Sequence, residues 1–383
     1  MPLSRPAEVS LPHLFERRTI AVNGLFLTQR VTGVQRYARE LCVHLAQAAP
    51  ARYRLVLISP RRGAADIPPD VEVVLDETRL PSPLWTQVRL PFLARRVGAD
   101  LLWSPTNIGP LAVRRQIITI FDASVFACPE AFSFAFRAYY RLLLPRLGRR
   151  ALRVVTVSEF SRCELLRFGM ARPSRIDIVS CGVSRAFHAG CDAGPWCEKQ
   201  PYVLTVGSRD PRKDLATLLS AWRLLPESIR GRRKLLVAGG GGNVFAGEAL
   251  EPLPEGVELL GRVREADLPG LYAASDLFVY PSRYEGFGLP PLEAMASGTC
   301  VLASRASSLP EVLGDAAAYF EPRDPGDLAG RIQALLESSE ERSRLRSAGL
   351  RRALRFTWES AAVQMLRILD EIFSGPPFRN LRP

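Results

Sequence analysis

Two glutamates eight positions apart, Glu285 and Glu293, mark the stretch of this chain best suited to chemistry. A glycine-containing turn and a Pro-Pro pair lie between them, and proline is favoured at the first position of a helix. The pattern predicts Glu285 on a loop and Glu293 in the first turn of a helix that ends near Gly298. Backbone N–H groups at such a helix start, here residues 286–289, can bind a phosphate. Because carboxylates repel phosphate, we expect the glutamates to accept hydrogen bonds from sugar hydroxyls beside it, as in a nucleotide sugar.

A basic loop follows a buried strand predicted over residues 202–206. Its polar residues Ser208, Arg209, Arg212 and Lys213 precede a predicted helix. Lysine offers a phosphate a compact charge, and arginine offers it a bidentate fork. Solvated basic residues at a helix start are the simpler interpretation. Beside the two-glutamate segment, however, we interpret this loop as the countercharge to a diphosphate.

Three further segments contain glycine after a predicted strand. Gly33 either lets the backbone approach a ligand at a helix start or is an ordinary turn glycine. The run Gly239–Gly242 suggests a dinucleotide site, but G-x-G-x-x-G must open a helix directly, and a loop is expected to follow here. Arg262 and Val263 are candidates for backbone contact with a base.

The composition narrows the classes of function. The 383 residues suit two domains, and the 47% hydrophobic content supports full cores. The net charge is +12, yet basic residues are spread along the chain and no zinc-finger or helix-turn-helix pattern occurs, so we expect no nucleic-acid partner. Only three of the 51 basic residues are lysine. This skew fits a GC-rich coding background, or a surface selected to bind anions such as membrane phospholipid.

Cysteine, histidine and hydropathy patterns support further expectations. The seven cysteines include no C-x-x-C, so we expect reduced thiols. The three histidines lack metal-ligand spacing, and no D-x-D or H-E-x-x-H occurs, so no metal is expected. No signal peptide and no apolar run of about 18 residues is present, which predicts a soluble, cytoplasmic protein.

The elements that position these residues follow a repeating pattern. From residue 18 onward, short apolar strands alternate with helices, which predicts parallel sheets covered on both faces. The alternation lapses over residues 191–200, where we place a linker. Two doubly wound α/β domains are therefore expected, with ligands at the carboxyl ends of the strands.

The segment over residues 132–153 mixes aromatic residues, leucine and arginine. It fits a helix with one core-facing and one solvated face, or a membrane-surface patch. Pro145 is expected to interrupt this helix.

Together these segments resemble the retaining GT-B glycosyltransferases of the family-4, "glycosyl transferases group 1" type. The resemblance covers roughly residues 18–370, and its specific part is the E-x7-E segment with a Gly-Phe-Gly-Leu-Pro core. The other matching pieces, which come in the family's order, are residues 33–37, 117–122, 155–161, 206–214, 261–263 and 309–312.

The resemblance implies the GT-B architecture. An acceptor-side Rossmann-like domain would span residues 18–195, and a nucleotide-sugar-binding domain residues 200–355. A closing helix over residues 356–373 would pack back toward the first domain. The implied activity is a retaining, metal-independent transfer from a nucleotide sugar, with GDP-mannose as first candidate. The acceptor would be a glycan or a lipid-linked glycan in surface polysaccharide or lipopolysaccharide synthesis, with peripheral contact at the inner membrane surface as a further expectation.

The resemblance also assigns roles to single residues. Lys213 matches the family's diphosphate-binding lysine, Glu293 the glutamate for the ribose hydroxyls, and Glu285 the one facing the donor sugar. Gly33 matches the loop that closes on the diphosphate. The candidate donor-binding residues are Gly33, Ser208, Arg209, Arg212, Lys213, Arg262, Val263, Glu285, Gly286, Phe287, Gly288, Leu289 and Glu293, and the candidate catalytic residues are Glu285, Lys213 and Asp122.

Three positions depart from the family's pattern. Ser208 stands where many members have arginine, a role open to Arg209 or Arg212. Phe121 replaces a common histidine, and Cys181 a common asparagine. In a front-face reaction the leaving diphosphate can take the acceptor's proton, so a histidine base is not required. The alternative is a catalytically silent GT-B protein that binds a nucleotide sugar or glycan.

Overall fold

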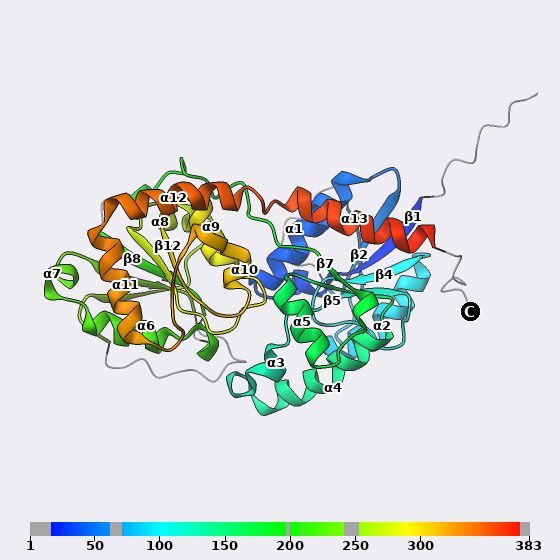
Figure 1. The fold of residues 1–383 in the computed structure, drawn as a ribbon. Helices are drawn as coiled ribbons and strands as arrows, with labels where there is room; N and C mark the ends of the chain where they lie inside the picture. Colours follow the sequence, from blue (N-terminus) through cyan, green and yellow to red (C-terminus); the bar gives the residue numbers. More distant parts are fainter. Residues whose placement is uncertain (1–16, 62–70, 197–199, 209, 241–252, 376–383) are drawn as a thin grey trace, which may run out of the picture.

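The computed structural model describes residues 17–61, 71–196, 200–208, 210–240 and 253–375. Its strands form two parallel sheets, which lie side by side with helices packed around each (Figure 1). Seven strands in the order β3-β2-β1-β4-β5-β6-β7 make one sheet, and six in the order β10-β9-β8-β11-β12-β13 make the other. The predicted pair of doubly wound parallel sheets is therefore confirmed.

The seven-stranded sheet is formed by the first half of the chain. One of its faces is covered by the helices α1 (Gly33–Ala48) and α13 (Trp358–Ser374). Three helices cover the other face: α2 (Ser82–Arg96), α4 (Phe134–Arg150) and α5 (Glu159–Arg167). The strands are β1 (Arg18–Asn23), β2 (Tyr53–Ser59), β3 (Glu72–Leu75), β4 (Leu101–Ser104), β5 (Gln116–Thr119), β6 (Arg153–Thr156) and β7 (Ile176–Ile178).

The six-stranded sheet is formed by the second half. Its chain order runs outward from β8 to β9 and β10 on one side and from β11 to β12 and β13 on the other. Loops diverge at such a switch point, here between β8 and β11, and leave a crevice at the carboxyl ends of the strands. The strands are β8 (Tyr202–Val206), β9 (Lys234–Ala238), β10 (Val257–Gly261), β11 (Leu277–Tyr280), β12 (Val301–Ser304) and β13 (Ala318–Phe320). The main helices are α6 (Leu215–Leu224), α8 (Leu268–Ala273), α9 (Leu289–Ala296), α10 (Leu309–Leu313), α11 (Pro325–Glu337) and α12 (Ser339–Ala353).

The last helix, α13, crosses back from the second half to the first and packs on α1. The rings of Tyr37 and Trp358 meet edge to face, with centroids 5.9 Å apart. A Cβ placed on Gly182 would lie 2.4 Å from the backbone nitrogen of Trp358, so the chain can pass this closely only where position 182 has no side chain. The helix α13 thus links the second half to the first by packing on α1.

Prolines account for the two main differences from the expected helices. No helix was expected over residues 82–96, yet α2 forms there with Pro91 inside it. The expected interruption at Pro145 was wrong, because α4 continues through it. An interior proline costs about 3 kcal/mol. Burial of neighbouring side chains offsets this cost, including Trp85 in α2 and Leu144 in α4.

Within the described residues, none of the helices is long and apolar enough to cross a membrane. The six cysteines in that part of the chain are unpaired thiols. Its histidine, cysteine and acidic side chains form no group of three that could hold a metal ion.

Candidate active site

Glu285 and Lys213 meet at the switch point of the six-stranded sheet. Lys213 ends the short turn that follows β8, and Glu285 lies on the loop after β11. One carboxylate oxygen of Glu285 accepts hydrogen bonds from the Lys213 ammonium at 2.5 Å, the Tyr280 hydroxyl at 2.8 Å and the Ser282 hydroxyl at 2.5 Å. Two residues 72 positions apart are thus joined because the carboxyl ends of parallel strands share one edge.

The surroundings of Glu285 keep its carboxylate charged. Burial would raise the pKa of Glu285, but Lys213 and the hydrogen bond from Ser282 outweigh burial and hold the pKa below the ordinary value of 4.5. Lys213 also lines a small pocket together with Gly207 and Ser208. A fixed carboxylate and a cation therefore stand side by side at the edge of a pocket.

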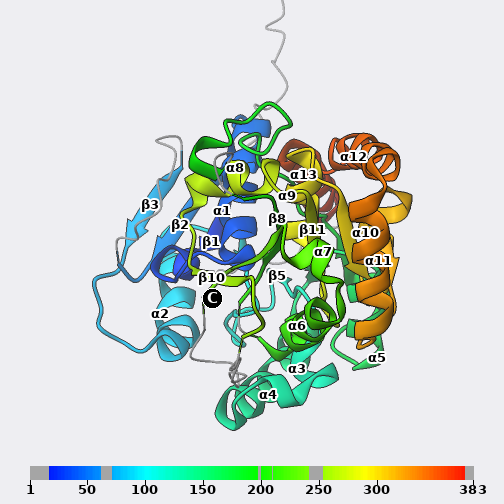
Figure 2. The ribbon, with the colours of Figure 1, turned by 90° about the vertical axis from the view of Figure 1, so that its left-hand side faces the viewer.

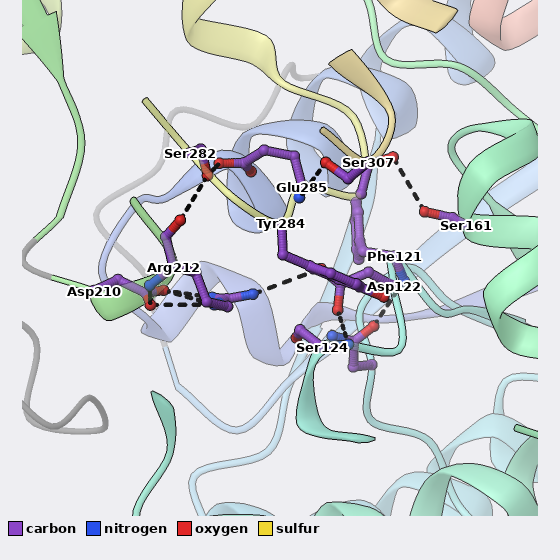
Figure 3. A network of polar contacts seen from close by, with 12 residues as sticks. Phe121, Asp122, Ser124, Ser161, Asp210, Arg212, Ser282, Tyr284, Glu285 and Ser307 are labelled. Carbon is purple, nitrogen blue, oxygen red and sulfur yellow. Dashed lines mark hydrogen bonds and ion pairs between the residues drawn. The ribbon is translucent and has the colours of Figure 1, made fainter. Parts of the chain in front are cut away.

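Backbone strain lies on both sides of this pair. Asp214, which follows Lys213, has φ 49°, and Ser307 has φ 53°. The hydroxyl of Ser307 accepts the backbone N–H of Glu285 at 2.9 Å (Figure 3). Non-glycine residues in such conformations cost about 1–3 kcal/mol and persist where the surrounding structure holds them, often at functional sites. The strain thus marks the positions that fix the two charged residues.

The loop that carries Glu285 is held by the other half of the molecule. The carbonyl oxygen of Gly286 accepts hydrogen bonds from the hydroxyls of Ser158 at 2.6 Å and Ser161 at 3.1 Å, both at the start of α5. A Cβ on Gly286 would lie 2.7 Å from the carbonyl oxygen of Phe121. A side chain at this position would push the two halves apart, so the site depends on their close approach.

A second contact reinforces this approach. The carboxylate of Glu311, on α10, accepts the backbone N–H groups of Glu159 at 2.7 Å and Phe160 at 2.9 Å. An acceptor from one half thereby caps the N-terminus of a helix in the other, where a negative charge is favoured. Nearby, the hydroxyl of Tyr284 donates to Glu164 at 3.2 Å.

The predicted place of Glu293 in the first turn of its helix was wrong, because α9 begins at Leu289 and Glu293 therefore lies in the second turn. Its carboxylate accepts the Tyr272 hydroxyl at 3.1 Å and pairs with the guanidinium of Arg36 from α1. Burial raises the pKa of Glu293, and Arg36 opposes that rise. The sequence reasoning included Arg36 only as part of the matching segment 33–37, and it assigned no role to Arg36 or Tyr272. A further signal at Arg36 was a cation in the first turn of a helix, where the helix dipole disfavours it.

Arg212 contacts residues of both halves. Its guanidinium bonds Asp210, stacks over Phe132 at 4.9 Å and lies 4.0 Å from Asp122 (Figure 3). Because Asp122 follows β5, Arg212 joins the two halves through an ion pair. Asp122 also accepts the backbone N–H of Ser124 at 2.8 Å. The part predicted for Arg212 in donor binding stays a prediction, and Arg209 lies outside the described residues.

The other predicted donor residues lie either around the start of α9 or in the segment after β10. A Cβ on Gly33 would lie 3.7 Å from the Leu289 side chain, so the Gly33 loop faces the start of α9. Gly288 has φ 96° as the residue preceding that helix, and Phe287 packs on Phe356, with ring centroids 5.6 Å apart. The segment after β10 differs: there Arg262 is exposed and Val263 is half-buried against the core.

The surroundings of Phe121 are apolar. Phe121 is buried, and its ring meets that of Tyr37 edge to face at 5.0 Å. Its backbone N–H donates to Asn107 at 3.0 Å. This wall of the site therefore offers no proton acceptor from the Phe121 side chain.

Comparison with known proteins covers both halves of the chain. Residues 31–187 match the family described as "Glycosyltransferase Family 4", and residues 192–352 match "Glycosyl transferases group 1". The O-antigen chain mannosyltransferase B of Escherichia coli is 35% identical over 270 residues, which cover 67% of this chain and 70% of that protein. The MMP alpha-(1->4)-mannosyltransferase of Mycolicibacterium hassiacum is 31% identical over 235 residues, or 59% and 56% of the two chains. The serotype-specific mannosyltransferase WbdA of Escherichia coli is 27% identical over 252 residues, and the match spans only 29% of WbdA.

Solved structures share the fold. Sucrose-phosphate synthase from Thermosynechococcus elongatus superposes with a TM-score of 0.72 at 21% identity, over 94% of this chain and 100% of that one. Anabaena HepE, solved with UDP and glucose, gives 0.70 at 19% identity, over 93% and 100%. WaaG, described as a glycosyltransferase involved in lipopolysaccharide biosynthesis, gives 0.70 at 18% identity, over 93% and 100%. These likenesses confirm the predicted α/β architecture of two Rossmann-like domains.

Proposed function

This chain belongs to the group 1, family-4 glycosyltransferases, and we propose that it transfers a sugar from a nucleotide-diphosphate donor with retention of configuration at the anomeric carbon. The observation that carries the proposal is the Glu285–Lys213 pair, fixed beside a pocket at the switch point of the second sheet. A cation suited to a diphosphate and a carboxylate suited to sugar hydroxyls are there joined in one hydrogen-bonded network.

Three parts of a donor are matched by three parts of this site. The diphosphate would lie against Lys213 and the backbone N–H groups at the start of α9. The ribose hydroxyls would donate to Glu293, and the hydroxyls of the sugar to Glu285. The ammonium of Lys213 would then move from the carboxylate toward the more highly charged diphosphate, which needs no metal ion for countercharge.

A front-face reaction fits the apolar wall formed by Phe121. The bond from the anomeric carbon to the diphosphate oxygen breaks, and the acceptor oxygen forms its bond to the same face of that carbon. The proton of the acceptor hydroxyl moves to the leaving diphosphate oxygen, so the protein supplies no base. Catalysis then rests on positioning and on stabilising the negative charge of the leaving group, which is the part of Lys213.

The mannosyl donor is proposed from the names of the relatives. The O-antigen chain mannosyltransferases B and RfbU, WbdA and the MMP alpha-(1->4)-mannosyltransferase are all described as mannosyltransferases. GDP-mannose is accordingly the first candidate donor, and a growing surface polysaccharide or its lipid-linked precursor is the acceptor class. The UDP and glucose found with HepE make UDP-glucose the second candidate.

A thermal-shift panel tests the proposed function. A ligand at one hundred times its Kd stabilises the folded state by about 2.7 kcal/mol, so the true donor should raise the melting temperature while others do not. We expect GDP-mannose to give the largest shift and to be turned over with a glycan acceptor. A panel without any shift contradicts the assignment. A shift without turnover or slow donor hydrolysis instead supports the catalytically silent alternative.

We further propose that the outer face formed by α2 and α4 meets an anionic membrane. The two helices lie on the side of the molecule away from α13 (Figures 1 and 2). Neither contains an acidic residue, and together they carry eight arginines. Exposed apolar side chains recur at every fourth position along α2 and just before it, and they are 37–56% exposed: Leu80, Leu84, Val88 and Phe92. An apolar stripe on a helix without acidic residues, together with the arginines of α2 and α4, fits a bilayer surface with acidic head groups.

Sedimentation with vesicles tests this surface. The triple variant Leu84→Ser, Val88→Ser, Phe92→Ser should bind phosphatidylglycerol vesicles at least about tenfold more weakly than the natural chain, because burial of these side chains in lipid contributes to binding. The control is Leu354→Ser, which removes an apolar side chain that is 77% exposed elsewhere on the surface. Equal binding by the triple variant, or no binding by the natural chain, rules out this membrane surface.

A further inference from the structure

Arg36 connects the two halves at the carboxylate of Glu293. It lies in the first turn of α1, against the seven-stranded sheet, and its guanidinium pairs with Glu293 from α9. The same guanidinium lies 3.0 Å from the carboxylate of Glu265, which precedes α8. One cation from the first half thus holds two carboxylates of the second half, across 257 positions of the chain for Glu293.

The contact is buried on both sides. The Glu293 side chain is 5% exposed and that of Arg36 is 15% exposed. A carboxylate at this depth needs a partner to remain charged. Glu265, Tyr272 and Arg36 face it, and Arg36 is the cation among them. Without Arg36, burial and the negative charge of Glu265 would both act against the charged form of Glu293.

The contacts also fix the direction of the carboxylate. Arg36 occupies one oxygen of Glu293, and the hydroxyl of Tyr272 occupies the other. An ionised carboxylate has about four lone-pair positions, so one position on each oxygen is left to accept a further hydrogen bond. Two such positions held in a fixed plane match the two neighbouring hydroxyls of a ribose.

We infer that Arg36 is a positioning residue of the nucleotide site: it holds the Glu293 carboxylate charged and oriented to accept the ribose hydroxyls, and so makes ribose recognition depend on the approach of the two halves. The inference rests on the proposed function of Glu293 as the ribose-binding residue. It adds a residue from the acceptor-side half to a recognition step otherwise confined to the second half.

A purely structural tie is the competing explanation for the Arg36 contacts. The approach of the halves, however, is also maintained by the hydroxyls of Ser158 and Ser161 on Gly286 and by the Glu311 cap on α5. These contacts do not involve Arg36. If Arg36 only held the two halves together, its loss would weaken the binding of every nucleotide alike. If Arg36 positions Glu293, its loss would weaken only the binding that the ribose hydroxyls contribute.

Calorimetry with paired nucleotides separates these explanations. GDP and UDP are each compared with their 2′,3′-dideoxy forms, which lack both hydroxyls. The natural chain should bind the ribose form of its nucleotide about 10- to 100-fold more tightly, as expected for hydrogen bonds to a charged acceptor. In Arg36→Met this preference should fall to about threefold or less, as it should in Glu293→Gln. Arg36→Lys, which keeps the charge, should retain part of the preference.

The matched control is Arg39→Met, on the same helix, where the arginine side chain is 36% exposed and pairs only loosely with Glu40 at 3.8 Å. This variant should keep the full preference for ribose. If Arg36→Met keeps it too, the inference is wrong. If the natural chain binds the nucleotide without preferring ribose, the role of Glu293 fails first. If it binds neither nucleotide nor any donor, the proposed function itself fails.

Discussion

Replacing Lys213 with alanine is expected to lower kcat by about 100- to 1,000-fold, the loss typical when one donor that stabilises a developing negative charge is removed. The variant lacks the cation beside the pocket. It also leaves the Glu285 carboxylate without its ammonium partner, so a negative charge would face the diphosphate. Both effects act in the same direction, on binding of the donor and on departure of the leaving group. Initial rates with the donor selected by thermal shift provide the measurement.

The control for Lys213 is another lysine of the same half. Lys234 on β9 is 46% exposed and lies 3.5 Å from Glu258, and Lys234→Ala should leave kcat unchanged. Lys213→Arg should recover part of the activity, because the charge is kept while its shape changes. Removing one partner of a buried ion pair can destabilise a protein by about 3–5 kcal/mol, so the melting temperature of each variant must be measured as well. A folded Lys213→Ala protein with natural kcat would remove the basis for the proposed site.

Changing Glu285 to glutamine is expected to separate sugar chemistry from nucleotide binding. The substitution keeps the size of the side chain and removes its charge. We expect kcat to fall by about 100-fold or more, because hydrogen bonds from the sugar hydroxyls to a charged acceptor are lost in the transition state. Binding of the nucleoside diphosphate without its sugar should not weaken, since Lys213 is freed from its ion pair.

Two measurements on Glu285→Gln check this expectation: the turnover rate, and the Kd of the nucleoside diphosphate by calorimetry. Glu321→Gln is the control, because that side chain is 66% exposed and pairs with Arg305 on the surface. A fall in the turnover rate together with an equally large weakening of nucleoside diphosphate binding would show that Glu285 acts on the diphosphate region as a whole. Unchanged turnover would exclude any role for Glu285 with the donor sugar.

The parts of the site that follow from local pattern could be predicted from the sequence. Glu285 and Lys213 each follow an apolar strand, and strands in a parallel sheet bring their carboxyl ends to one edge. The alternation of short apolar strands with helices likewise predicted both parallel sheets. The helix α2 was not predicted, and the burial that stabilises it despite Pro91 depends on the sheet beneath.

The contacts between the halves could not be predicted in this way. The Arg36–Glu293 pair and the hydroxyls of Ser158 and Ser161 on Gly286 depend on how the two sheets approach each other. No local pattern specifies that approach. Arg212 illustrates the same limit, because no local pattern predicted its contacts with Phe132 and Asp122 of the other half.

The most direct test of the donor site is a crystal structure of the natural chain with its nucleotide sugar bound. The account predicts a diphosphate oxygen within hydrogen-bond distance of the Lys213 nitrogen, about 2.7–3.2 Å, and ribose hydroxyls on the Glu293 carboxylate. The hexose hydroxyls should face Glu285. A nucleotide bound elsewhere, or one bound here with its ribose directed away from Glu293, would contradict the account.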